Sequence, residues 1–147
     1  YMFGDNILVA PILNDEGIAE YYVPEGKWTD IITGKVLEGG KWYKHKCSYF
    51  EIPALAKPNS IIAYGNFERQ IEYDYLEGTT FTIYELEVCP IYDTEANKVF
   101  ELTATRHGNK IECEYTDTKA SFKIAVANTD KTVEIAPNFS GKVIIEL

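Results

Sequence analysis

Apolar and polar residues alternate with a period of two through the last third of this chain. In residues 100–105 Phe, Leu and Ala alternate with Glu and Thr, and in residues 111–115 Ile, Cys and Tyr alternate with Glu. Because successive side chains of a β-strand point to opposite faces of the sheet, each run predicts a strand with one buried face. Residues 106–110 include Gly108 and Asn109, which suit a tight turn, so the two runs predict a hairpin.

The same alternation continues toward the C-terminus in residues 122–126, 133–135 and 143–147. The segments between these runs, residues 128–130 and 137–141, contain Asn, Asp, Pro and Gly, which favour turns. Short strands that recur about every 8–12 residues are typical of an antiparallel β-sandwich. This half of the chain therefore predicts such a sandwich.

The first half of the chain also predicts strands, which Pro and Gly separate. The expected strands are residues 7–13, 19–23, 27–32, 41–43, 49–52 and 60–64. No segment has the long apolar stripe at helical spacing that an amphipathic helix needs, so we expect little helix.

A polar break at residues 65–69 separates the strand that ends at Tyr64 from an aromatic run that begins at Tyr73. We place the domain boundary in this break. The sequence thus predicts an all-β fold of two small antiparallel β-sandwich-like domains in tandem, residues 1–66 and residues 67–147. Each domain is small for an independent core, so we expect them to depend on each other or on a neighbouring domain.

The charge balance excludes two classes of partner. The chain has 147 residues with 14 Lys and Arg against 23 Asp and Glu, a formal net charge of -9. Affinity for nucleic acid comes mainly from Lys and Arg that neutralise phosphates, so we expect no nucleic acid partner. Anionic lipid is disfavoured for the same reason. The apolar runs are far shorter than the roughly 18 residues of a membrane span, so we expect no membrane partner.

The cysteines and histidines give no sign of a metal or cofactor. Cys47, Cys89 and Cys113 are an odd number without a C-x-x-C pair, and only His45 and His107 accompany them. We therefore expect no metal site, no cofactor and a reduced, cytoplasmic setting. Core packing is our interpretation of Cys113, which lies on the apolar face of its predicted strand.

Five aromatic residues allow two interpretations. Trp28, Trp42, Tyr43, Tyr73 and Tyr75 either form a platform on which sugar rings stack, or pack in the core and across strands. We favour packing, because buried aromatics dominate small β-cores. If the chain binds a sugar, Trp42, Tyr73 and Tyr75 are the candidate residues.

Several motifs, in order, carry a resemblance to a known family. Residues 1–11, YMFGDNILVAP, resemble the segment that follows the catalytic barrel in glycoside hydrolase family 31. The residues that continue the resemblance in the family's order are 22–30, 33–34, 39–42, 53 and 58–62, and residues 71–86 resemble the opening of the family's distal β-domain. Within the family the pattern is most similar to bacterial α-xylosidases, whereas α-glucosidases usually have Arg and Gly-Ser near the positions of Lys57 and Asn59-Ser60.

The resemblance implies a retaining glycosidase, in which one Asp attacks the anomeric carbon and another acts as acid and then base on a (β/α)8 barrel. This chain has no counterpart of the nucleophile motif. Gly4-Asp5-Asn6 repeats the acid/base tripeptide of some members, but no Trp precedes it. We therefore expect no catalytic residue here. For Asp5 we expect a structural role, a hydrogen bond to backbone amides of its turn.

These observations favour the C-terminal part of an α-xylosidase-like enzyme, without the barrel and inactive alone. The chain begins with Tyr1 and not Met, so we expect it to be a piece of a longer protein. Its expected partners are the missing barrel, a second copy and carbohydrate. One alternative is a carbohydrate-binding module of an α-glucosidase of the same family, based on Tyr73 and Tyr75. Another is an assembly surface that covers the apolar run 7–13.

Overall fold

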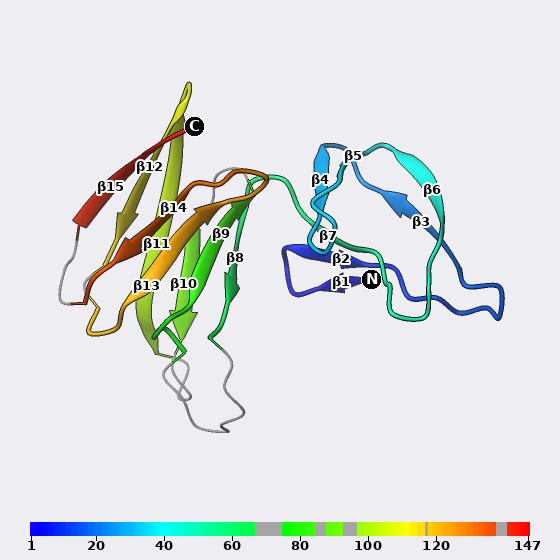
Figure 1. The fold of residues 1–147 in the computed structure, drawn as a ribbon, viewed down its shortest axis with the longest axis horizontal. Helices are drawn as coiled ribbons and strands as arrows, with labels where there is room; N and C mark the ends of the chain where they lie inside the picture. The colour runs from blue at the N-terminus through cyan, green and yellow to red at the C-terminus, as the bar shows by residue number, and fades with distance from the viewer. Residues whose placement is uncertain (67–74, 85–87, 93–96, 117, 138–140) are drawn as a thin grey trace. The chain divides into compact units, whose positions relative to one another are not determined.

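The computed structural model describes residues 1–66, 75–84, 88–92, 97–116, 118–137 and 141–147. Every regular element in these ranges is a β-strand, which confirms the all-β prediction (Figure 1). The chain divides into two compact units, Tyr1–Pro58 and Asn59–Leu147, which we call the first and second units.

The first unit consists of a five-stranded antiparallel sheet and a separate two-stranded ribbon. The sheet has the order β1-β2-β7-β4-β5. Its strands are β1 (Met2–Phe3), β2 (Ile7–Val9), β7 (Ala54–Ala56), β4 (Lys27–Asp30) and β5 (Val36–Glu38). The antiparallel ribbon pairs β3 (Ile18–Val23) with β6 (Lys41–Lys46), so that Tyr21 lies opposite Tyr43 and Tyr22 opposite Trp42.

Two glycines just before β6 bring the start of this strand close to the end of β3. Gly39 N donates a hydrogen bond to Gly26 O at 2.7 Å, and Gly40 N donates to Val23 O at 2.8 Å. A Cβ atom on Gly39 would lie 1.6 Å from Pro24 O, so only glycine fits there. Gly40 has φ 79°, in the left-handed region that glycine adopts without strain.

The core of the first unit is two small clusters. Val23, Trp28, Leu37 and Leu55 form one, with Tyr21, Tyr43 and Leu8 packed against it; Ala10, Ala19 and Cys47 form the other. Trp28 and Tyr43 thus serve packing, in line with the interpretation that we favoured for the aromatic residues. The larger cluster joins the ribbon to the sheet, because Val23 and Tyr43 come from the ribbon and the rest mostly from the sheet.

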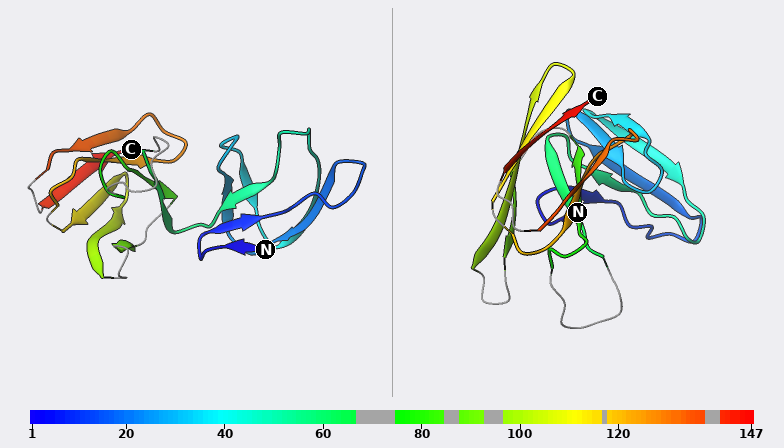
Figure 2. Two further views of the ribbon diagram at one scale, coloured as in Figure 1. Left: turned by 90° about the horizontal axis from the view of Figure 1, so that it is seen from below. Right: turned by 60° about the vertical axis from the view of Figure 1, so that its left-hand side comes forward.

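The second unit is a sandwich of two four-stranded sheets (Figure 2). One sheet has the order β14-β13-β9-β8 and the other β10-β11-β12-β15. The strands of the first sheet are β8 (Ser60–Tyr64), β9 (Thr80–Tyr84), β13 (Phe122–Val126) and β14 (Thr132–Ile135). Those of the second are β10 (Val88–Tyr92), β11 (Lys98–His107), β12 (Lys110–Tyr115) and β15 (Gly141–Glu146).

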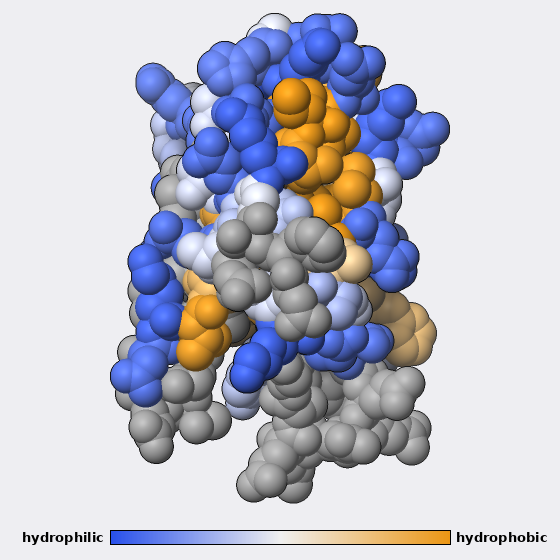
Figure 3. Space-filling model, turned by 90° about the vertical axis from the view of Figure 1, so that its left-hand side faces the viewer, coloured by the Kyte–Doolittle hydropathy of each residue, from blue (hydrophilic) through white to orange (hydrophobic). Residues whose placement is uncertain are grey.

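Three phenylalanines fill the centre of the sandwich. Phe81 and Phe122 come from one sheet and Phe100 from the other, and their ring centroids lie 5.1–5.6 Å apart. All three are at most 1% exposed. Cys113 is fully buried in the same core, as its place on an apolar strand face predicts. The outer face of this unit that Figure 3 shows is mainly hydrophilic around a narrower hydrophobic area.

The predicted hairpin is present, and one pairing departs from the antiparallel expectation. In β11 and β12, Ala104 lies opposite Cys113 and His107 opposite Lys110. His107 thus lies at the hairpin end. β9 and β13, however, pair in parallel. The chain between them forms β10, β11 and β12 of the opposite sheet, and this long crossover returns β13 in the same direction as β9.

The strand that we assigned to the end of the first domain belongs to the second unit. β8 pairs with β9, with Ile61 opposite Ile83, and both residues are buried in the core of the sandwich. In the structure, the first compact unit therefore ends at Pro58, ahead of this strand.

Candidate functional site

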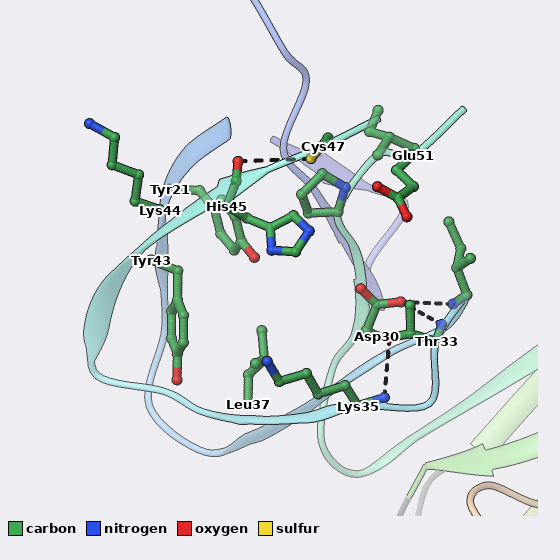
Figure 4. A pocket seen from close by; sticks show the side chains of 13 residues that line it. Tyr21, Asp30, Thr33, Lys35, Leu37, Tyr43, Lys44, His45, Cys47 and Glu51 are labelled. Carbon is green, nitrogen blue, oxygen red and sulfur yellow. Dashed lines mark hydrogen bonds between the residues drawn. The ribbon is translucent and has the colours of Figure 1, made fainter. Parts of the chain in front are cut away.

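The first unit contains a pocket of about 290 Å³ (Figure 4). The ribbon contributes Tyr21, Tyr43, Lys44 and His45, the sheet contributes Asp30 and Leu37, and the remaining residues come from two loops. These loop residues are Ile32, Thr33, Lys35, Cys47, Glu51, Ile52 and Pro53. The pocket is thus open between the ribbon and the end of β4.

Two tyrosines form an aromatic wall. Tyr21 and Tyr43 are cross-strand partners, and their rings lie nearly parallel with centroids 6.1 Å apart. Tyr43 is fixed by its Oη, which donates a hydrogen bond to Glu38 O at 2.8 Å. Burial, reinforced by the negative charge of Asp30, raises the pKa of Tyr21. The Tyr21 hydroxyl therefore remains protonated at neutral pH and can donate a hydrogen bond.

Asp30 is held in place by the turn that follows β4. Its Oδ1 accepts hydrogen bonds from the backbone amides of Ile32 and Thr33, both at 2.9 Å. Gly34, with φ 73°, closes the turn by donating from its amide to Asp30 O at 2.8 Å. This arrangement is an Asx turn, which orients the carboxylate without using its second oxygen. Figure 4 shows Asp30 across the cavity from the Tyr43 ring.

Glu51 and His45 complete the polar part of the pocket. Glu51 Oε2 accepts a hydrogen bond from Ser48 N at 2.8 Å. Hydrogen bonding to Ser48 lowers the pKa of Glu51, so its carboxylate is ionised at neutral pH. The imidazole of His45 points into the cavity, whereas the Lys44 ammonium points away from it (Figure 4). Lys44 Nζ lies 3.8 Å from Glu20 Oε2.

The cysteine beside the pocket is not an activated nucleophile. Cys47 is 8% exposed, and its Sγ lies 3.9 Å from His45 O as a weak donor. Burial raises the pKa of the Cys47 thiol, with Glu51 adding to the effect. A thiol with a raised pKa holds little of the reactive thiolate at neutral pH, which argues against covalent catalysis here.

Of the described aromatic residues considered from sequence for sugar binding, Tyr43 lines this pocket, whereas Trp42 and Tyr75 do not. Trp42 is 69% exposed and packs edge to face on Tyr22, with centroids 5.8 Å apart. Tyr75, 43% exposed, belongs to the second unit. Tyr73 lies outside the described residues. A sugar-binding role for Trp42, Tyr73 and Tyr75 stays a prediction.

Asp5 lies in the turn between β1 and β2, as expected. Among the described residues, no backbone amide donates the predicted hydrogen bond to its carboxylate, and residue Asp5 is exposed. Gly4, with φ 61°, provides the left-handed conformation that this turn needs.

The alternation of side chains along the sequence predicts only some of the residues that line the pocket. Residues 41–46 alternate so that Tyr43 and His45 share one face and Trp42 the other, but alternation alone does not tell which face meets a cavity. Asp30 followed by Thr33-Gly34 was a usable signal for an Asx turn.

The described residues contain neither a cluster of metal ligands nor a membrane-spanning helix. No three His, Cys, Asp or Glu side chains within them gather closely enough to hold a metal ion. Within the same ranges, no helix has the length and apolar character to cross a membrane.

Two family models together match most of the chain. Residues 1–62 match the glycosyl hydrolase family 31 C-terminal domain, and residues 74–147 match the C-terminal domain of alpha-xylosidase YicI. Among characterised proteins, alpha-xylosidase XylQ of Lactiplantibacillus pentosus is 40% identical over 90 residues, which are 59% of this chain and 12% of that protein. An alpha-xylosidase of Emericella nidulans is 30% identical over 74% of this chain and 17% of its own length.

Solved structures share the fold at lower identity. The cycloalternan-forming enzyme of Listeria monocytogenes matches 99% of this chain with a TM-score of 0.82 and 21% identity, over 18% of its own length. A family 31 alpha-xylosidase of Xanthomonas citri matches 100% of this chain with a TM-score of 0.76 and 16% identity, over 19% of its own length. The chain therefore spans less than a fifth of each of these relatives.

Proposed function

We propose that this chain, which belongs to glycosyl hydrolase family 31 and matches the C-terminal domain of its α-xylosidase-like enzymes, has a non-catalytic role. In this proposal the chain supports the catalytic barrel of a longer polypeptide. That polypeptide releases α-xylosyl residues from the ends of oligosaccharides with retention of configuration. Both domain matches are to C-terminal domains, and the chain carries no counterpart of the family's nucleophile motif.

The observation that carries the supporting role is a set of exposed apolar side chains in the first unit. Phe3, Leu13, Tyr49 and Phe50 are 65%, 88%, 94% and 91% exposed. Large exposed apolar side chains in one small unit mark a surface that another protein surface covers. We propose that the catalytic barrel covers it. A second copy of the chain is the other candidate occupant.

The activity part of the proposal is tested with two polypeptides, the 147-residue chain and the longer open reading frame that contains it. The longer polypeptide should hydrolyse an aryl α-xyloside, and the 147-residue chain should not exceed a buffer blank. Asp5→Asn serves as a control in both, because Asp5 has no catalytic role in the proposal. Turnover by the short chain that is lost in Asp5→Asn would overturn it. A longer polypeptide that cleaves only aryl α-glucosides would overturn the xyloside assignment.

The covering surface is tested by light scattering and by a hydrophobic dye. The short chain should be a monomer that binds the dye, and replacing Tyr49 and Phe50 by Ser should reduce the dye signal. The longer polypeptide should bind less dye. A stable dimer of the short chain without dye binding would assign the surface to a second copy instead of the barrel.

A further inference from the structure

We propose that the pocket of the first unit is a binding site for one neutral sugar ring. The pocket is separate from the supporting role proposed above. The choice of xylose as the first probe rests on that proposed function, but the argument for a sugar ring rests on the pocket itself.

The size of the pocket fits a single ring. Its volume of about 290 Å³ is close to the lower limit of the roughly 300–1,000 Å³ range of ligand pockets. A nucleotide or an oligosaccharide needs more room than this. A water molecule or a metal ion needs far less, and the described residues include no cluster that could hold a metal.

The walls of the pocket are divided as a sugar ring requires. Tyr21 and Tyr43 line one side, together with Leu37, and Asp30 and Glu51 lie on the opposite side (Figure 4). A pyranose has C–H groups that pack on aromatic or apolar surface and hydroxyl groups that need hydrogen-bond partners. A ring placed between these walls would meet both requirements at once.

The carboxylates are already oriented before any ligand binds. Asp30 is fixed by the amides of Ile32 and Thr33, and Glu51 by the amide of Ser48. Each carboxylate uses one oxygen in these bonds and keeps further acceptor capacity for hydroxyl groups. Because little side-chain freedom is left to lose, binding costs less conformational entropy than at a mobile site.

The mixture of charges favours an uncharged ligand. Lys35 provides a donor on the same side of the cavity as Leu37, and Asp30 and Glu51 provide acceptors (Figure 4). An anion would be repelled by the two carboxylates, and the Lys35 ammonium offsets part of their attraction for a cation. The ring nitrogens of His45 and the Tyr21 hydroxyl add further hydrogen-bonding groups. A polyhydroxylated neutral molecule can use donors and acceptors of both kinds.

The test is a titration of the 147-residue chain with D-xylose and methyl α-D-xylopyranoside, followed by amide NMR shifts. We expect saturable shifts confined to the pocket residues, with a Kd on the order of 1 mM, or about -4 kcal/mol. Xylitol is the related open-chain polyol, which has no ring to stack, so it should bind at least several-fold more weakly. D-Glucuronate should also bind more weakly, because its charge opposes Asp30 and Glu51.

Matched variants separate the pocket from general effects. His45→Ala removes an exposed side chain that points into the cavity, and it should weaken xylose binding about tenfold, the equivalent of about 1.4 kcal/mol. His107→Ala makes the same change at the hairpin end in the second unit and should leave binding unchanged. If His45→Ala perturbs folding, Lys35→Ala tests the same cavity, because its own backbone hydrogen bonds remain.

Three results would overturn the proposal. One is the absence of saturable shifts with either xylose probe in a chain whose amide spectrum is well dispersed. Another is equal weakening by His45→Ala and His107→Ala. The last is a shift pattern centred on Trp42 or Tyr75, which would move sugar binding to the residues first suggested by the sequence. Each result leaves the barrel-supporting function standing, because none of them measures hydrolysis.

Discussion

The two units of this chain differ in how their hydrophobic cores are organised. The second unit has one continuous core that includes Phe81, Phe100 and Phe122, shared between two sheets. The first unit has only two small clusters, and most of the large exposed apolar side chains among the described residues belong to it. A single sandwich core stabilises its own unit, whereas a divided core depends on contacts from outside. The first unit is therefore expected to depend more on outside contacts than the second.

The largest expected effect comes from the centre of the sandwich. Phe122→Ala removes a ring that contacts Phe81, Phe100 and Tyr115, and should lower the free energy of unfolding of the second unit by about 3–5 kcal/mol. Amide resonances of the two units, followed separately through urea unfolding, measure this loss. Leu55→Ala is the matched change in the first unit. If both variants shifted both units equally, the chain would unfold as one body and the contrast would be wrong.

An effect of intermediate size is expected on the rates at which the two buried cysteines react with a thiol reagent. Burial raises the pKa of Cys113 to about 11 and also raises that of Cys47, so at pH 8 both react with a thiol reagent mainly after local opening. Cys47 belongs to a cluster of three small or medium residues beside the pocket, and Cys113 to the sandwich core. We expect Cys47 to react about tenfold faster or more, which corresponds to about 1.4 kcal/mol less opening free energy.

The cysteine measurement is made in a Cys89→Ser background with an aromatic disulfide reagent, and each site is identified by peptide mass. Rates in urea should be equal for Cys47 and Cys113, which serves as the control. Faster reaction of Cys113 in the native chain would show that the sandwich core opens more readily than the first unit, which would contradict the prediction.

The smallest expected effect lies on the surface that we propose the barrel covers. Tyr49→Ser and Phe50→Ser alter side chains that are over nine-tenths exposed, so each should change the stability of the short chain by at most about 0.5 kcal/mol. In the longer polypeptide the same changes should cost clearly more, because covered apolar area is lost. Thermal unfolding of both polypeptides measures the two effects. Equal small effects in both would contradict a covering role for this surface.

Alternation along the chain was enough to predict the all-β fold and the β11–β12 hairpin, because period two reports which face of a strand is buried. It does not report which strand is the neighbour. The parallel pairing of β9 with β13 and the membership of β8 in the sandwich were therefore missed. A local pattern cannot encode partners that a long crossover brings together.

The site was harder to predict than the fold for a related reason. Tyr21, Asp30, Tyr43 and His45 lie on three strands, and none of them is unusual in its own segment. Of the aromatic residues considered from sequence, Tyr43 lines the pocket, whereas Trp42 and Tyr75 do not. Exposure of Trp42 and burial of Trp28 depend on the register of β3 on β6 and of β4 on β5, which the sequence does not state directly.

The parallel register of β9 with β13 also sets an order of events during synthesis. β9 cannot gain this neighbour until the chain has continued through β10, β11 and β12 and has left the ribosome as far as Val126. Closing so long a loop makes the pairing slow to form relative to local hairpins. The first unit, whose strands precede β8, is therefore complete while the second is still being made. During synthesis, the unit with the smaller, divided core is therefore the first to be complete.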